Sequence, residues 1–267
     1  MTVLVAKLLL APGFVVAVSL AGRRWGVGVA GVLGGLPVVV APILAVVTIV
    51  HGRDFGAEAA AGALLALAAL ALFVVVYANA SQRLGPLPSL LAGGAAFLAG
   101  VGLLHTLDLG PAPSLAFVGI AFAAGLRCLP AAPAEPVRPA PPPWWDLPAR
   151  GLAAAALVIA ITAVSGSLGP SLTGLLAPFP ILTSVLAVFT HGHAGPRQVT
   201  LLMRSFLVGF YSFATFCFVL ALTVDSLGGV AAFSLALLAA LGVQVLVFAM
   251  AWRWLGLRPA DCSAAAS

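Results

Sequence analysis

The chain has 267 residues, of which 63% are hydrophobic and only 7% are charged, whereas a soluble domain carries about 25% charged residues. With a mean hydropathy of +1.19, this composition excludes a soluble globular domain and predicts a polytopic, all-α transmembrane helix bundle. The twelve Lys and Arg outnumber the seven Asp and Glu, but they stand singly at the ends of apolar runs. That pattern is typical of membrane topology and excludes nucleic acid as a partner.

Apolar runs between Gly, Pro and charged residues predict nine spans. The first run contains Lys7 and is followed by Arg23 and Arg24, the reverse of the charge order of a signal peptide, so we interpret it as a membrane helix. The fifth run is the shortest and crosses only if Arg127 extends to the interface and the bilayer thins. The predicted spans are 3–21, 27–50, 57–79, 88–107, 114–129, 150–167, 171–190, 198–223 and 228–252.

A proline-rich linker divides the chain into two halves. Residues 130–149 contain eight prolines and end near Trp144 and Trp145, a composition that favours an extended spacer closed by an interfacial anchor. We therefore predict a first membrane repeat of five spans at 1–129, a second of four spans at 150–256, and a short tail at 257–267.

The two halves resemble each other around a His-Gly pair. Residues 35–52 align without gaps on residues 175–192, so that His51-Gly52 falls on His191-Gly192 at an offset of 140 residues. In both copies a run broken by proline precedes the histidine. We interpret this as an internal repeat.

Charge asymmetry predicts the topology. With nine spans and the N-terminus outside, ten basic residues lie on the cytoplasmic side and only Lys7 and Arg53 lie outside. An odd number of spans before the second copy makes the repeats inverted, with the C-terminus in the cytoplasm of a bacterial inner membrane. The ten are Arg23, Arg24, Arg83, Arg127, Arg138, Arg150, Arg197, Arg204, Arg253 and Arg258.

Inverted repeats with broken helices are typical of secondary transporters, whose substrates bind near the bilayer midplane at the breaks. The corresponding breaks here contain Pro37 in the first repeat and Pro178, Phe179 and Pro180 in the second. The alternative is a pair of simple packing kinks.

Polar residues form two helical stripes in the second repeat. Arg204, Ser205, Tyr211, Ser212 and Thr215 share one face of the eighth span. On the seventh span, Thr183 and Thr190 are seven residues apart, and so are Ser184 and His191. This spacing places each pair on one face of the helix. Because lipid offers these groups no partners, the stripes face inward as a substrate-binding surface or, alternatively, bond helices together.

The sequence contains no recognisable catalytic motif. No mid-span carboxylate, GxxxxGK[ST], HExxH or GxSxG pattern is present, so we expect neither an enzyme nor a cofactor, and cation coupling through a carboxylate is disfavoured. His191 and His193 lack the spacing of a metal site, and Cys128, Cys217 and Cys262 are interpreted as free thiols.

The segment Gly174–Pro180, GLLAPFP, precedes a run that ends at His191, and an Arg-containing helix with Phe210-Tyr211-Ser212 follows. This pattern resembles the four-helix inner-membrane proteins of the GlpM type over about 100 residues, 150–254, and more faintly in the first half. The histidine lies several residues later here and the first proline is displaced by one. The resemblance implies a duplicated family tied to envelope polysaccharide production, and it supplies no catalytic residues.

Together these features predict a small inner-membrane transporter or flippase for a polar or anionic solute or a lipid-linked envelope precursor. The alternative is a non-transporting scaffold or accessory subunit, for example in envelope polysaccharide production. Beside the lipid bilayer, the partners left open are such a substrate, a second copy of the chain and another membrane protein.

Overall fold

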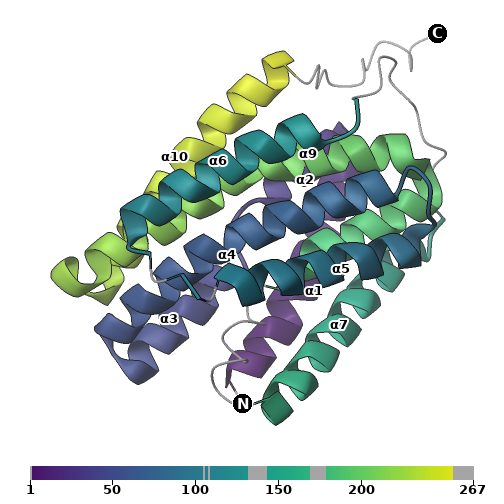
Figure 1. The fold of residues 1–267 in the computed structure, drawn as a ribbon. Coiled ribbons are helices and arrows are strands. Elements are labelled where there is room, and N and C mark those ends of the chain that lie inside the picture. The colour runs from purple at the N-terminus through teal and green to yellow at the C-terminus, as the bar shows by residue number, and fades with distance from the viewer. Residues whose placement is uncertain (1, 105, 108, 132–142, 169–178, 255–267) are drawn as a thin grey trace, which may run out of the picture.

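The computed structural model describes residues 2–104, 106–107, 109–131, 143–168 and 179–254, which form a bundle of helices without a strand (Figure 1). The prediction of an all-α bundle is confirmed for this part of the chain. In chain order the helices are α1 (Thr2–Trp25), α2 (Val27–Gly34), α3 (Val40–His51), α4 (Arg53–Ala80), α5 (Pro86–Leu104), α6 (Pro111–Cys128), α7 (Asp146–Leu168), α9 (Ile181–Leu227) and α10 (Gly229–Trp254).

Five of the described helices are long and apolar enough to cross a membrane: α4, α5, α6, α9 and the part Gly229–Met250 of α10. These helices suit a membrane protein, because a helix satisfies its own backbone groups in lipid. The weak fifth run is among them. It begins at Pro111 rather than at residue 114, since the first helical turn tolerates proline. The total of nine spans stays a prediction.

The predicted second span is not one continuous helix. It is divided into α2 and α3, with Gly35–Val39 between them. Pro37 lies in this break, where its missing N–H and the flexible Gly34-Gly35 pair interrupt the helical hydrogen bonds. At 1.5 Å per residue α2 is about 12 Å long and α3 about 18 Å, so neither alone crosses a hydrocarbon core of about 30 Å.

Helix α9 folds back on itself at Gly195. This glycine has φ 77 and ψ 178, a conformation essentially restricted to glycine, and Pro196 follows it. The later segment, 196–227, runs antiparallel to α4. At one end Gln82 Nε2 donates to Thr200 Oγ1 at 3.3 Å. At the other end the guanidinium of Arg53 lies beside Gly228.

The bundle therefore has two distinct ends. We call the end that holds the Gly195 kink the His193 end, and the opposite end, with Gly52 and the α9–α10 turn, the Gly228 end. Helices α4 and α6 both finish at the His193 end, where Asn79 Nδ2 donates to the Cys128 carbonyl at 3.1 Å. Arginines gather at this end, among them Arg23, Arg24, Arg83, Arg127, Arg150, Arg197 and Arg204. Which side of a membrane this end faces stays a prediction.

The core lies between α4 and the later segment of α9, with α5, α6 and α10 packed around them and α1 beside α7 (Figure 1). Its largest fully buried side chains are mostly aromatic, among them Phe73, Tyr77, Phe97, Phe122, Phe206 and Phe216. Side chains of this size exclude lipid and water from the interior and fix the helices around the break in α2–α3.

Candidate functional site

The break between α2 and α3 rests directly on α9. Gly31 of α2 meets Ser205 of α9, and Gly35, the residue after α2, meets Gly209 of α9. The small residues are four apart on each side, so that two small-residue faces cross. A Cβ added to Gly209 would lie 2.5 Å from the Val32 carbonyl oxygen. Backbone therefore contacts backbone, near the middle of segment 196–227.

Two polar side chains bind the carbonyl groups at the end of α2. Gln244 of α10 donates from Nε2 to the Val32 carbonyl at 2.8 Å. Ser212 Oγ donates to the Gly209 carbonyl at 3.0 Å and lies 3.4 Å from the Gly35 carbonyl. The last carbonyls of a helix lack the regular partners within it. The Val32 carbonyl accepts from the Gly35 N–H at 3.2 Å, and the two side chains add donors at this helix end inside an apolar bundle. Gln244 thus bonds another helix, and Ser212 lies at the break that contains buried Pro37.

The polar face of the earlier segment of α9, 181–194, turns inward. Thr183, Ser184 and His191 are buried, and the His191 ring stands edge-on to Tyr77 of α4 with ring centroids 6.1 Å apart. Within the described structure, Tyr77 Oη, His191 Nδ1 and Ser184 Oγ have no hydrogen-bond partner. Buried polar groups are normally paired, so this unpaired set marks the contact between α4 and α9 as a candidate binding surface.

The second predicted break lies just before α9, and of its three residues the structure describes Phe179 and Pro180. Phe179 packs edge-on against Phe97 of α5 at a centroid distance of 5.7 Å, and Pro180 is the buried residue that precedes α9. Pro178 lies outside the described residues. The contact of Phe179 therefore holds the start of α9 against α5.

Arg204 does not face the break. Its Nη2 donates to the Pro130 carbonyl at 2.8 Å and lies 3.4 Å from the Leu129 carbonyl, so the guanidinium binds the C-terminal end of α6, where a positive charge is favourable. This contact gives Arg204 a structural role and directs it away from Ser212.

The other residues of the predicted stripe also divide between neighbours. Ser205 is buried against Gly31, and Tyr211 packs edge-on against Phe122 of α6 at 5.1 Å. Thr215 donates to the carbonyl of Tyr211 in its own helix at 2.8 Å, the common arrangement for threonine in membrane helices. The stripe does not converge on one point.

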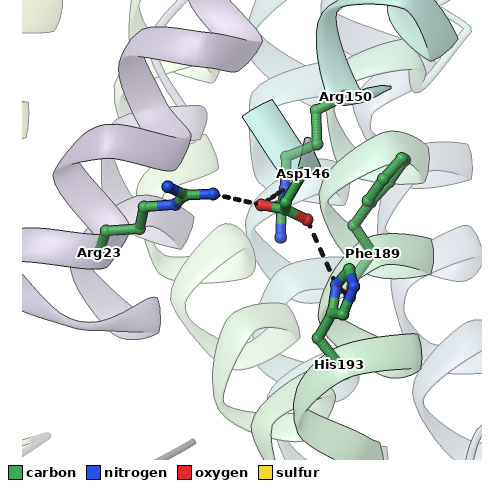
Figure 2. Close-up of polar contacts among 5 residues, drawn as sticks. All are labelled: Arg23, Asp146, Arg150, Phe189 and His193. Carbon is green, nitrogen blue, oxygen red and sulfur yellow. Dashed lines mark hydrogen bonds and ion pairs between the residues drawn. The ribbon is translucent and has the colours of Figure 1, made fainter. Parts of the chain in front are cut away.

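An ionic cluster at the His193 end was missed by the sequence analysis (Figure 2). The Asp146 side chain is fully buried, and its Oδ2 accepts from Arg23 of α1 at 2.8 Å and from Arg150 of α7 at 2.9 Å. Its Oδ1 lies 3.2 Å from His193 Nδ1 on α9. The Arg150 guanidinium in turn lies over the Phe189 ring, 5.1 Å from its centroid. Three helices that are far apart in the sequence thus meet at one carboxylate.

The charge of Asp146 is held in place by its partners. Burial raises the pKa of this carboxyl, but the hydrogen bonds from Arg23 and Arg150 outweigh burial, and the pKa lies below its ordinary value. Asp146 is therefore ionised at neutral pH. The four-residue spacing of Asp146 and Arg150 is a local signal of an ion pair, whereas nothing in the sequence indicates Arg23 or His193 as further partners.

Among the described residues, no group of three or more His, Cys, Asp or Glu side chains could hold a metal ion. Cys128 and Cys217 are free thiols, the first exposed and the second buried. No protein-family model, curated protein or solved structure matches the chain.

Proposed function

We propose that the chain is a small membrane transporter or flippase, built from two inverted repeats, that moves a polar or anionic solute or a lipid-linked precursor past the break between α2 and α3. The observation that carries the proposal is the break itself. A helix interrupted near the middle of the bundle, with its carbonyls bound by Ser212 and Gln244, is the kind of element at which secondary transporters bind their substrates.

The arrangement of the helices supports the inverted repeat. In the first half α3 ends at His51, Gly52 follows with φ 96 and ψ 170, and the long α4 begins. In the second half the segment 181–194 contains His191, and the turn comes at Gly195 with φ 77 and ψ 178, three residues after Gly192, the residue that aligns with Gly52; the long segment 196–227 then begins. The two turns lie at opposite ends of the bundle, as inversion requires. The sidedness in the membrane and the GlpM-like ancestry stay predictions.

The second candidate is a scaffold or accessory subunit, and the packing of α2 favours it. Gly31 and Gly35 contact Ser205 and Gly209 so closely that the two helices have no room to slide. Arg204 and Thr215 bind backbone carbonyls, as they do in helices that serve only to assemble.

Access of water to the break separates the two functions. We would place Ser212→Cys, a nearly isosteric change, in a chain that carries Cys128→Ser, Cys217→Ala and Cys262→Ser, and reconstitute it in vesicles. A small charged thiol reagent is then added to either side. A transporter exposes its break in at least one state, so we expect modification from one or both sides.

The chain supplies a matched control. Native Cys217 lies on α9, five residues after Ser212, and is equally buried, but it is not at the break. A chain that keeps only Cys217 should stay unmodified, while one that keeps only exposed Cys128 should react. If the Ser212→Cys variant is as inert as the Cys217 chain from both sides, the transporter proposal fails and the scaffold is favoured.

A second assay measures movement of lipid directly. Vesicles with the protein and a fluorescent short-chain phosphatidylglycerol are treated with dithionite, which bleaches only the outer leaflet. A flippase allows bleaching beyond the outer half, and empty vesicles do not. Bleaching that stops at one half would remove the flippase branch, and the accessibility of Ser212→Cys would then decide between a solute transporter and a scaffold.

A further inference from the structure

The earlier segment of α9, 181–194, connects the break to one end of the bundle. A Cβ added to Gly34, the last residue of α2, would lie 3.3 Å from Leu182 Cδ2, so the first turn of the segment touches the break. The segment ends before the Gly195 kink, at the His193 end. At 1.5 Å per residue it is about 21 Å long. It therefore spans the distance between the break and the surface of the bundle at that end.

Unpaired polar groups follow the inner face of this segment. Ser184 and His191 are seven residues apart and share the face that turns toward Tyr77 of α4, with Ser184 about 10 Å farther from the His193 end. Ser184 is 1% exposed, His191 9% and Tyr77 0%, and Ser184 Oγ, His191 Nδ1 and Tyr77 Oη have no hydrogen-bond partner in the described structure. Gln244 Oε1 at the break also lacks one there. Buried polar groups are costly unless something binds them.

The groups on this face fit an uncharged hydroxyl better than an ion. The Tyr and Ser hydroxyls both donate and accept, and an imidazole nitrogen does either according to its tautomer. Charged groups at the His193 end are engaged elsewhere: Arg150 binds Asp146 and lies over Phe189 (Figure 2), and Arg204 binds the Pro130 carbonyl. An ion would lose its hydration without a counter-charge from these side chains, whereas a hydroxyl would exchange hydrogen bonds with water for equivalent ones.

Neighbouring helices enclose the segment, which suits a small soluble molecule. Val185, on another face of the segment, packs with Val15 of α1 and Ala154 of α7, and Phe97 of α5 contacts Phe179 just before the segment begins. A lipid headgroup could enter only with its acyl chains trailing between these helices. A soluble molecule needs an opening only at the His193 end.

We propose that the inner face of the segment 181–194 binds an uncharged, hydroxyl-bearing solute and forms the part of the substrate path between the His193 end and the break. This inference rests on the proposed transport function and names its substrate class and its route. Tyr77 and His191 bind hydroxyl groups of the solute near the surface, Ser184 is the next contact inward, and Gln244 Oε1 accepts a hydrogen bond at the break.

Cysteine modification tests the path with a probe of this chemistry. Ser184→Cys is placed in the chain without native cysteines, reconstituted in vesicles and treated with hydroxyethyl methanethiosulfonate, an uncharged reagent that carries a hydroxyl. Val185→Cys is the matched control, because Val185 is 5% exposed against 1% for Ser184 but faces α1 and α7. We expect Ser184→Cys to react at least tenfold faster than Val185→Cys, and His191→Cys, nearer the His193 end, to react faster still. Equal rates for Ser184→Cys and Val185→Cys overturn the path.

A second reagent tests the charge of the solute. Sulfonatoethyl methanethiosulfonate has nearly the same length and carries a negative charge. After each rate is divided by the rate of the same reagent with free cysteine, we expect the sulfonate to modify Ser184→Cys at least tenfold more slowly than the hydroxyethyl reagent does. Equal normalised rates overturn the uncharged substrate class.

Failure of this route can be told apart from failure of transport. If Ser184→Cys is as inert as Val185→Cys while Ser212→Cys reacts, the break is reached by another route, so this proposal fails and the transporter proposal stands. If Ser184→Cys reacts with the expected charge preference but Ser212→Cys is inert from both sides, the transporter proposal fails and the path fails with it. Only the binding of hydroxyl groups by this face is then supported.

Discussion

The contact between α2 and α9 makes a sharp prediction for Gly209→Ala. A Cβ at this position would lie 2.5 Å from the Val32 carbonyl oxygen and 3.1 Å from Val32 Cα, and both are backbone atoms that cannot rotate away. Overpacking of this kind costs about 1–3 kcal/mol. In a chain of 267 residues, about 2–4 °C of Tm is lost per kcal/mol, so we expect Tm to fall by roughly 2–12 °C.

The assay is thermal unfolding of the purified protein in one detergent, followed by tryptophan fluorescence or by light scattering. Gly62→Ala is the matched control, because Gly62 is helical in α4 and a Cβ there meets nothing within 4 Å. Alanine is a better helix former than glycine by about 1 kcal/mol, so this variant should be unchanged or slightly more stable. If Gly209→Ala unfolds at the same temperature as Gly62→Ala, the close approach of α2 and α9 is refuted.

Three further predictions use the same unfolding assay. Gln244→Met keeps the volume but removes the side-chain donor to the Val32 carbonyl, which then keeps only the Gly35 N–H at 3.2 Å, and stability should fall by about 1 kcal/mol. Gly195→Ala places a side chain at φ 77 and ψ 178 and should cost about 1–3 kcal/mol. Because the pKa of Asp146 is lowered from its ordinary 3.8 by folding, its contribution is complete above that value and is lost as pH falls below it; the acid-induced fall in Tm should therefore be smaller in Asp146→Asn.

Local chemistry explains which parts of the fold could be predicted. The break in the second span follows from Gly34, Gly35 and Pro37, because glycine and proline act on the backbone wherever the chain is placed. The inward orientation of Ser184 and His191 follows from helical periodicity and from the cost of polar groups in lipid. Each of these inferences needs only neighbours in the sequence.

The partners of Arg204 and Asp146 could not be predicted in full, because they depend on tertiary packing. Arg204 shares a helical face with Ser212 in the sequence, yet its long side chain reaches the carbonyl of Pro130, and only the position of α6 beside α9 makes that partner available. Asp146 is similar. Its pair with Arg150 is visible at four-residue spacing, whereas Arg23 and His193 become partners because α1 and α9 pack on α7.

The two kinds of packing around α9 suggest where motion would begin. The later segment is locked to α2 by backbone contacts at Gly209, and any sliding there would separate a close-packed interface. The earlier segment ends at a glycine kink and buries Ser184 and His191 without hydrogen-bond partners in the described structure, so less free energy is lost when it moves away from α4 and those groups meet water or substrate.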